Sequence, residues 1–298
     1  MYQEVEGTHQ IGDVTLFTKS WKPSDPPVAK LIFIHGFNDH MDRYYELFPT
    51  LANRGIQVDG FDQRGWGRSV RKESDKGLTG PTETVIADIV SFISAKLPSS
   101  IPIFVMGHSM GGGEALTLAS NPKYADLVGQ IRGWILESPF IAFPKGHEPS
   151  AITVFFGRLA RPILPRKQLQ SALPAENLTR DPEVVHSLKT DALLHGLGTL
   201  EGLSGMIDRT NDLSSGKLKL NKTVKGIWLG HGTIDKATCY EGSKNWFNSQ
   251  CQDINDKEFK SYDGWYHQLH ADLPEDRPVF AKDVGDWIMK RVGREVKL

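Results

Sequence analysis

The sequence predicts an α/β protein with a mostly parallel central sheet and helices on both faces. Short apolar runs alternate with amphipathic runs along most of the chain, which is typical of strands joined by helices that cross over the sheet. A chain of 298 residues, 39% of them hydrophobic, is long enough to bury a large core. The alternation fails in one long segment, which indicates an insertion into that sheet.

Seven short apolar runs, bounded by turn-forming residues, are the expected strands. They cover residues 14–21, 30–34, 56–61, 101–106, 131–137, 224–230 and 258–262. Between them, residues 81–95 place apolar side chains at helical spacing, and Pro81 suits a first helical turn. Further helices are expected at residues 41–54, 112–120, 240–249 and 278–291. The expected order is therefore strand, helix, strand throughout.

Residues 138–222 are the segment in which this order fails. Proline, glycine and basic residues are mixed there with apolar clusters, and no convincing strand pattern is present. Because the segment is too long for an ordinary loop, we expect an inserted, mainly helical cap between two core segments, residues 1–137 and 223–298. Ligands of open parallel sheets bind beyond the carboxyl ends of the strands, so such a cap would roof the pocket.

Composition excludes several function classes. With 35 basic and 36 acidic side chains, the formal net charge of −1 gives no overall field to hold nucleic acid. No apolar run is long enough for a membrane span, and residues 1–10 are polar where a secretory signal would be apolar. Cys239 and Cys251 are too few for a disulfide framework or a zinc site, so we expect a cytoplasmic protein without a metal or a cofactor.

The most informative motif is Gly-His-Ser-Met-Gly at residues 107–111, directly after an expected strand. This Gly-x-Ser-x-Gly pattern is typical of a nucleophile elbow, a sharp turn between a strand and a helix that exposes the serine. The glycines on either side avoid collisions in the tight turn. The pattern therefore predicts that Ser109 is a catalytic nucleophile.

A serine hydroxyl needs an imidazole to take its proton, and the imidazole needs a carboxylate to fix its tautomer. In hydrolases with this elbow, the acid and then the histidine follow the serine along the chain. Asp235 and His267 each lie just past the end of an expected strand, and we predict that they fill these roles. Alternatives remain for both: Asp208 or Asp212 for the acid and His270 for the base.

Two backbone N–H groups are expected to stabilise the oxyanion that forms when the serine attacks a carbonyl group. One should belong to Met110, which follows the nucleophile at the start of a helix. The other should come from the loop after an early strand, where His35, Gly36 and Phe37 follow residues 31–34. We predict that Phe37 is this second donor.

Four segments together resemble the monoacylglycerol lipases of the α/β-hydrolase superfamily. They are His-Gly-Phe-Asn-Asp-His at 35–40 with Arg43 and Tyr44, Phe-Asp-Gln-Arg-Gly-Trp-Gly-Arg-Ser at 61–69, Gly-His-Ser-Met-Gly-Gly at 107–112 and Tyr-Asp-Gly-Trp-Tyr-His-Gln-Leu-His at 262–270. The resemblance covers nearly the whole chain outside residues 138–222. It implies a serine hydrolase with the α/β-hydrolase fold that cleaves a monoacylglycerol to a fatty acid and glycerol without a cofactor.

The resemblance also carries site residues over to this chain. The catalytic serine, acid and base fall on Ser109, Asp235 and His267. The polar groups around the glycerol fall on four further residues: Asp39, Arg43, His108 and His270. Leu188 stands where some relatives have a tyrosine that contacts the glycerol, so strict preference for glycerol esters is in doubt.

Residues 152–164 of the expected cap combine bulky apolar side chains with arginines. One interpretation is a helix packed on the core with its arginines in water. The other, which the resemblance favours, is a peripheral contact with a membrane or lipid droplet, from which a lipophilic monoester enters the pocket. Alternative functions are a lysophospholipase, a broad-specificity carboxylesterase, an acyltransferase or a non-catalytic lipid-binding receptor with this fold.

Overall fold

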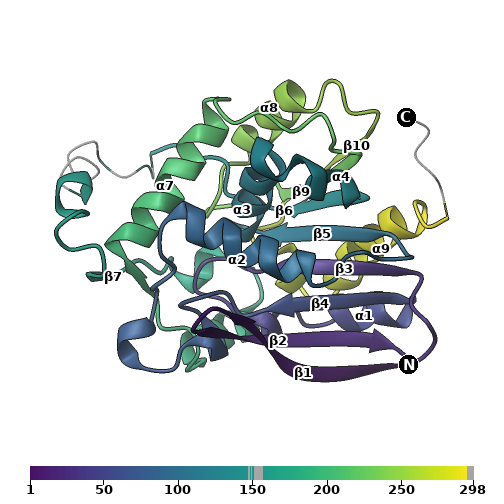
Figure 1. Ribbon diagram of the computed structural model, residues 1–298, viewed down its shortest axis with the longest axis horizontal. Coiled ribbons are helices and arrows are strands. Elements are labelled where there is room, and N and C mark those ends of the chain that lie inside the picture. Colours follow the sequence, from purple (N-terminus) through teal and green to yellow (C-terminus); the bar gives the residue numbers. More distant parts are fainter. Residues whose placement is uncertain (147, 149, 151–156, 294–298) are drawn as a thin grey trace.

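The computed structural model describes residues 1–146, 148, 150 and 157–293. An eight-stranded sheet crosses the molecule in the order β1-β2-β4-β3-β5-β6-β9-β10 (Figure 1). The strands are β1 (Tyr2–Ile11), β2 (Val14–Pro23), β3 (Ala29–Ile34), β4 (Ile56–Phe61), β5 (Ile103–His108), β6 (Gly133–Glu137), β9 (Gly226–Gly232) and β10 (Asp256–Tyr262). From β4 to β10 all neighbours are parallel, and the β1–β2 and β2–β4 pairs are antiparallel. The α/β fold class expected from the sequence is confirmed.

Helices cover both faces of the sheet, and each face buries its own apolar cluster. One face carries α1 (Leu47–Asn53) and α9 (Arg277–Met289). The other carries α2 (Thr82–Ser94), α3 (Met110–Ala119), α4 (Ala125–Gln130) and α8 (Tyr240–Gln250). Short 3-10 helices complete the connections: η1 (Met41–Arg43), η2 (Gly67–Ser69), η3 (Glu73–Asp75), η4 (Pro122–Tyr124) and η6 (Leu269–Ala271). The apolar face of α2 expected from its spacing is buried, with Ile89 and Ile93 fully covered.

The structure corrects two details of the expected order. The polar N-terminus forms β1, which pairs with β2 in a hairpin that turns at Gly12, where φ is +55°. The expected order of strand, helix, strand is therefore wrong at this edge of the sheet, because β1, β2 and β3 follow one another without a helix. The helix expected at residues 41–54 is broken, since Tyr45 has φ +40° between η1 and α1.

Most of residues 138–222 lie beyond the ends of the parallel strands, at the left of Figure 1. Their described elements are β7 (Gln168–Gln170), η5 (Ala175–Asn177), α6 (Pro182–Thr190), β8 (Leu197–Thr199) and α7 (Leu200–Ser214). The antiparallel β7–β8 pair has no counterpart among the expected elements. Of the apolar stretch 152–164, residues 152–156 lie outside the described residues, and Leu159, Ile163 and Leu164 are exposed.

Several contacts hold this segment against the sheet. Thr199 donates its backbone N–H to the carbonyl of Gly77 over 3.1 Å. Arg209 of α7 donates to Glu114 of α3 over 3.1 Å, and both side chains are buried. Within the described part of the chain, no helix is both long and apolar enough to cross a bilayer.

Candidate active site

The turn between β5 and α3 has the strained backbone expected of an elbow. Ser109 has φ +53° and ψ −118°, a conformation that side-chain-bearing residues rarely adopt, and it caps the N-terminus of α3. A Cβ atom on Gly107 would lie 2.4 Å from the carbonyl oxygen of Gly111, and one on Gly111 would lie 2.2 Å from that of Ile34. These distances explain in atomic terms why glycine stands on both sides of the serine.

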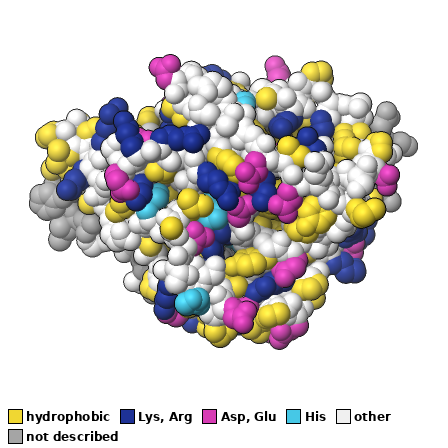
Figure 2. All heavy atoms as spheres, turned by 90° about the horizontal axis from the view of Figure 1, so that it is seen from below, with side chains coloured by type: hydrophobic (Ala, Val, Ile, Leu, Met, Phe, Trp, Pro, Cys, Tyr) yellow, Lys and Arg dark blue, Asp and Glu magenta, His cyan; other side chains and the backbone are white. Residues whose placement is uncertain are grey.

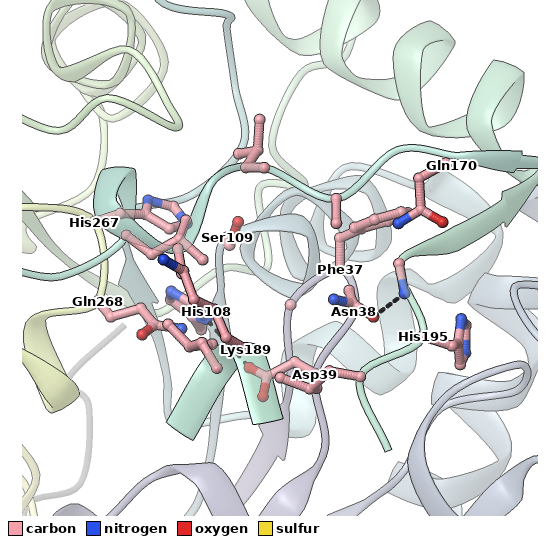
Figure 3. Close-up of a pocket in the computed structure, with 18 residues that line it drawn as sticks. Phe37, Asn38, Asp39, His108, Ser109, Gln170, Lys189, His195, His267 and Gln268 are labelled. Carbon is pink, nitrogen blue, oxygen red and sulfur yellow. Dashed lines mark hydrogen bonds and ion pairs between the residues drawn. The ribbon is translucent and has the colours of Figure 1, made fainter. Parts of the chain in front are cut away.

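A pocket opens at Ser109 (Figure 3). The described residues that line it come from the ends of β3 and β5, from the loop after β10 and from the 138–222 segment. They are Gly36, Phe37, Asn38, Asp39, His108, Ser109, Gln170, Ala172, Leu173, Ala175, Leu178, Leu188, Lys189, Leu194, His195, Gly196, His267 and Gln268. Because both leucines and polar side chains line it, the pocket suits an amphiphilic ligand.

Asp235 and His267 meet although 32 residues separate them. The Nδ1 atom of His267 lies 2.8 Å from Oδ2 of Asp235, and both side chains are buried. Since Nδ1 is taken up by the carboxylate, Nε2 is the ring nitrogen left for another partner. His267 lines the same pocket as Ser109, so the structure brings all three sequence-predicted catalytic residues together.

Asp235 is held by more than one partner. Its Oδ1 accepts the backbone N–H groups of Ala237 and Thr238, at 2.7 and 3.0 Å. Its Oδ2 also accepts the Thr238 hydroxyl at 2.8 Å and lies 3.0 Å from Nε2 of His231. Burial raises the pKa of Asp235, but the charge of His267 and hydrogen bonds from both histidines outweigh burial and hold the pKa well below its ordinary value. Asp235 is therefore a carboxylate at neutral pH.

The two expected oxyanion donors, Phe37 and Met110, line one small cavity together, and Phe37 also lines the pocket at Ser109. Phe37 lies on the pocket wall after β3, and its ring packs against Trp66. Met110 is the first residue of α3, where the first N–H groups have no acceptor within the helix. Among the described residues that line this pocket Met110 does not appear, and its side chain faces a smaller cavity beneath α7.

Asp39 forms the polar end of the pocket. Its side chain is buried, Oδ2 accepts the Tyr44 hydroxyl at 2.6 Å, and Oδ1 accepts the backbone N–H of His40 at 2.8 Å. His108 lies 3.8 Å away and also lines the wall. Burial raises the pKa of Asp39, but the nearby His108 ring, with His35 and Arg43, brings it below its ordinary value. Burial lowers the pKa of His108.

Two residues that the resemblance assigns to the glycerol do not reach the wall of the described pocket: Arg43 and His270. Arg43 is buried and turns toward α6, where it donates to Ser187 over 3.2 Å and to Asp191 over 3.0 Å. His270 lies in η6 behind His108, with the two ring centroids 4.9 Å apart. Leu188 of α6 does line the pocket.

The alternative catalytic carboxylates lie elsewhere. Asp208 pairs with Arg158 and Arg161, and Asp212 pairs with Lys217, all of them at the surface of the 138–222 segment. Neither carboxylate lines the pocket that Ser109 lines.

One group among the described residues has side chains of the kind that bind metals. Ligand atoms of His108, Glu137 and His270 lie within 4.8 Å of one another. Oε1 of Glu137 accepts the Nδ1 hydrogen of His270 at 2.6 Å, whereas Oε2 of Glu137 and Nε2 of both histidines have no partner among the described residues.

Sequence reasoning missed three residues at this site. Thr238 and His231 contact the carboxylate of Asp235, and Glu137 contacts His270. The sequence does indicate a special role for Glu137, because it is a charged residue at the end of an apolar strand next to the elbow. His231 and Thr238 carried none, because only the turn after β9 brings them to Asp235.

The chain is similar to several known proteins. The family model described as "Serine aminopeptidase, S33" matches residues 25–274. A Schizosaccharomyces pombe protein named "Putative monoglyceride lipase" is 32% identical and aligns with 92% of this chain and 71% of its own length. Mouse "Monoglyceride lipase" is 26% identical over 98% of this chain and 92% of its own. The crystal structure of a soluble variant of Saccharomyces cerevisiae monoglyceride lipase with a substrate analog superposes with a TM-score of 0.86 at 22% identity, covering 97% of this chain and 96% of that one.

Proposed function

The chain belongs to the serine aminopeptidase S33 family of hydrolases, and we propose that it cleaves the ester bond of monoacylglycerols to give a fatty acid and glycerol. The observation that carries the proposal is the hydrogen bond from His267 to Asp235 beside the pocket that Ser109 lines. The names of the relatives at 26–32% identity support the substrate class. A pocket lined by both leucines and polar side chains fits a molecule with one acyl chain and a hydroxylated head.

The proposed reaction runs through an acyl-enzyme. Ser109 Oγ attacks the ester carbonyl as Nε2 of His267 takes its proton, and Asp235 stabilises the imidazolium that forms. The N–H groups of Phe37 and Met110 hold the oxyanion. The tetrahedral intermediate collapses, glycerol leaves with the proton from His267, and the acyl group stays on Ser109. His267 then deprotonates a water molecule, which releases the fatty acid and restores the serine.

Residues 138–222 are proposed to act as the cap of this site. Leu188, Leu194 and Leu173 of this segment form part of the pocket wall. Leu159, Ile163 and Leu164 are exposed in a stretch that also carries arginines. At the left end of Figure 2, hydrophobic and basic side chains occur together. This combination supports peripheral contact with an anionic lipid surface, through which a single-chain lipid would reach the pocket.

One observation favours a broader carboxylesterase as the second candidate. Leu188 offers no hydrogen bond to the polar end of the pocket, so recognition of glycerol there depends on fewer groups. A substrate series separates the two functions. A monoacylglycerol lipase prefers medium- and long-chain monoacylglycerols to acetyl esters, whereas a general esterase hydrolyses acetyl esters equally well or better.

The direct test is labelling of Ser109 with a fluorophosphonate probe, together with hydrolysis of monoacylglycerols. We expect the wild-type protein to be labelled and active, and Ser109→Ala to lose both properties while keeping its thermal transition. Turnover by a folded Ser109→Ala protein would overturn the mechanism. Labelling without hydrolysis of any monoacylglycerol would overturn the substrate assignment alone.

A further inference from the structure

A second carboxylate lies directly behind the polar wall of the pocket. Glu137 ends β6, is fully buried, and pairs in the sheet with His108 at the end of β5. Its Oε1 atom accepts two hydrogen bonds from His270, one from the backbone N–H at 3.1 Å and one from Nδ1 at 2.6 Å. Burial raises the pKa of Glu137, but His270 and His108 outweigh burial and bring it below its ordinary value, so the group is ionised.

An ionised carboxylate only accepts hydrogen bonds, so Nδ1 of His270 must carry a proton. The backbone hydrogen bond from the same residue fixes the position of the ring as well as its tautomer. Nε2 of His270 has no protein partner within the described chain. Glu137 therefore determines both where the His270 ring lies and which of its nitrogens donates.

His270 in turn packs on the residue that faces the pocket. Its ring lies edge-to-face against His108, with centroids 4.9 Å apart and planes at 85°. On its other side it lies against Tyr44, with centroids 4.3 Å apart, and Tyr44 donates to Asp39. His270 therefore contacts one polar lining residue, His108, directly, and it contacts Tyr44, which holds the other, Asp39.

From this arrangement we propose that Glu137 is a positioning residue for the alcohol half of the site. By holding His270, it keeps His108 and Asp39 in the geometry that receives the hydroxyl groups of the leaving alcohol. The inference rests on the proposed function, and it identifies the alcohol half of the substrate as the part that this network recognises. It also gives His270 a place behind the wall instead of direct contact with glycerol.

One feature separates this role from ordinary support of the core. The network reaches the pocket through its polar lining residues His108 and Asp39, and not through the leucines that line the same pocket. Loss of Glu137 should therefore weaken catalysis only for substrates whose leaving group carries hydroxyls. A residue needed only for folding would affect all esters alike.

The test compares a 1-monoacylglycerol with the methyl ester of the same fatty acid, whose leaving group has no further hydroxyl. The variants are Glu137→Gln, which keeps the acceptor oxygen but not the charge, and Glu137→Met, which removes both. We expect kcat/KM for the monoacylglycerol to fall about tenfold relative to the methyl ester in Glu137→Met, with a smaller fall in Glu137→Gln. Equal changes for both esters would overturn the proposal.

Glu114→Gln is the matched control, since Glu114 is also a fully buried, ion-paired glutamate close to the elbow. It contacts Arg209 of α7 rather than the polar wall, so it should lower stability without changing the ratio of the two kcat/KM values. A shift of that ratio in Glu114→Gln as large as the shift in the Glu137 variants would assign the effect to general loosening and overturn the proposal.

Nitrogen-15 NMR of the histidine rings tests the network without any substrate. We expect Nδ1 of His270 to be protonated in the wild-type protein and its signal to shift in Glu137→Gln, with a smaller shift for His108. An unprotonated Nδ1 in the wild-type protein would overturn the inference even if monoacylglycerol hydrolysis were intact. Conversely, the expected spectra without monoacylglycerol hydrolysis would overturn only the proposed function.

Discussion

Nδ1 of His267 lies 2.8 Å from Oδ2 of Asp235, and this contact depends on two adjacent parallel strands. Asp235 follows β9 and His267 follows β10, which pair along their whole length. Beyond the strands, the backbone N–H groups of Thr233 and Ile234 donate to the carbonyls of Tyr262 and Trp265. The two loops are therefore locked together. The 138–222 segment adds contacts to both, because Leu178 accepts the backbone N–H of Gln268 and Ser138 accepts the Thr238 hydroxyl.

Replacing Asp235 with asparagine should nearly abolish turnover. An amide can donate to His267 and so favour the wrong ring tautomer, and it no longer offsets the charge of the imidazolium. We expect kcat to fall about 10⁴-fold, as in other enzymes with this arrangement. Single-turnover acylation of Ser109 measures the effect directly.

Asp212→Asn is the control for this substitution, because Asp212 pairs with Lys217 at the surface. We expect its kcat to equal that of the wild-type protein. A large loss of kcat in Asp212→Asn, together with a mild effect of Asp235→Asn, would show that Asp212 and not Asp235 is the catalytic acid.

Gly111→Ala should destabilise the folded state. The added Cβ would lie 2.2 Å from the carbonyl oxygen of Ile34 and 2.5 Å from that of His35, and neither backbone group can move without distorting β3. We expect a loss of about 3 kcal/mol in the free energy of unfolding. The control is Gly129→Ala in α4, where the nearest atom lies at an ordinary contact distance of 3.4 Å. Urea denaturation of both variants checks the difference, and equal stabilities would contradict it.

Leu188→Tyr should increase selectivity for glycerol esters. Leu188 lines the pocket on α6, and a hydroxyl there could reach the hydroxylated end of a substrate. One neutral hydrogen bond corresponds to about a fivefold gain in kcat/KM for a monoacylglycerol over the methyl ester. Leu188→Phe, which adds the ring without the hydroxyl, is the control. If both variants change the ratio equally, ring size rather than hydrogen bonding is responsible.

Glu114 should make the folded state less stable as the pH rises through the neutral range. Burial raises the pKa of Glu114 to about 7 from 4.5, and Arg209 and Gln63 only partly oppose this shift. Between pH 4.5 and about pH 7, Glu114 has lost its proton in the unfolded chain but keeps it in the folded chain. The contribution of Glu114 to the free energy of unfolding is therefore full below pH 4.5 and is lost as the pH rises to about 7.

Urea denaturation of wild type and Glu114→Gln from pH 5 to pH 8 measures this contribution. Buried His35 and His108 have lowered pKa values and act in the opposite direction, but both proteins share them. We expect the difference in unfolding free energy between the two proteins to change by about 2 kcal/mol across this range. A constant difference would contradict the raised pKa of Glu114.

The parallel part of the sheet and the meeting of Ser109, Asp235 and His267 could be predicted because each rests on a local pattern. Apolar blocks mark strands, and the ends of parallel strands share one edge. β1 could not be predicted in this way, since its partly exposed residues alternate weakly and its partner β2 supplies the pairing. The break at Tyr45 likewise depends on tertiary contacts that the helical pattern of residues 41–54 does not contain.

The polar end of the pocket shows a different limit. Similarity to a family placed Asp39 and His108 on the wall, but it also assigned Arg43 and His270 to direct contact with glycerol. Their positions depend on partners far away in the sequence, Asp191 for Arg43 and Glu137 for His270. Sequence motifs predict which residues belong to a site, whereas packing decides whether each side chain lines the pocket or lies behind its wall.

The attachments of the 138–222 segment are unevenly distributed, and this has a consequence for its dynamics. α7 is tied through Arg209 to Glu114, β8 through Thr199 to Gly77, and α6 by buried Asp181 and half-buried Asp191 to arginines of the core. Residues 157–167, before β7, carry mostly exposed side chains. Amide hydrogen exchange should therefore be slow along α7 and fast at 157–167. Substrate would gain access by local unfolding of one flank, on a faster timescale than displacement of the whole segment.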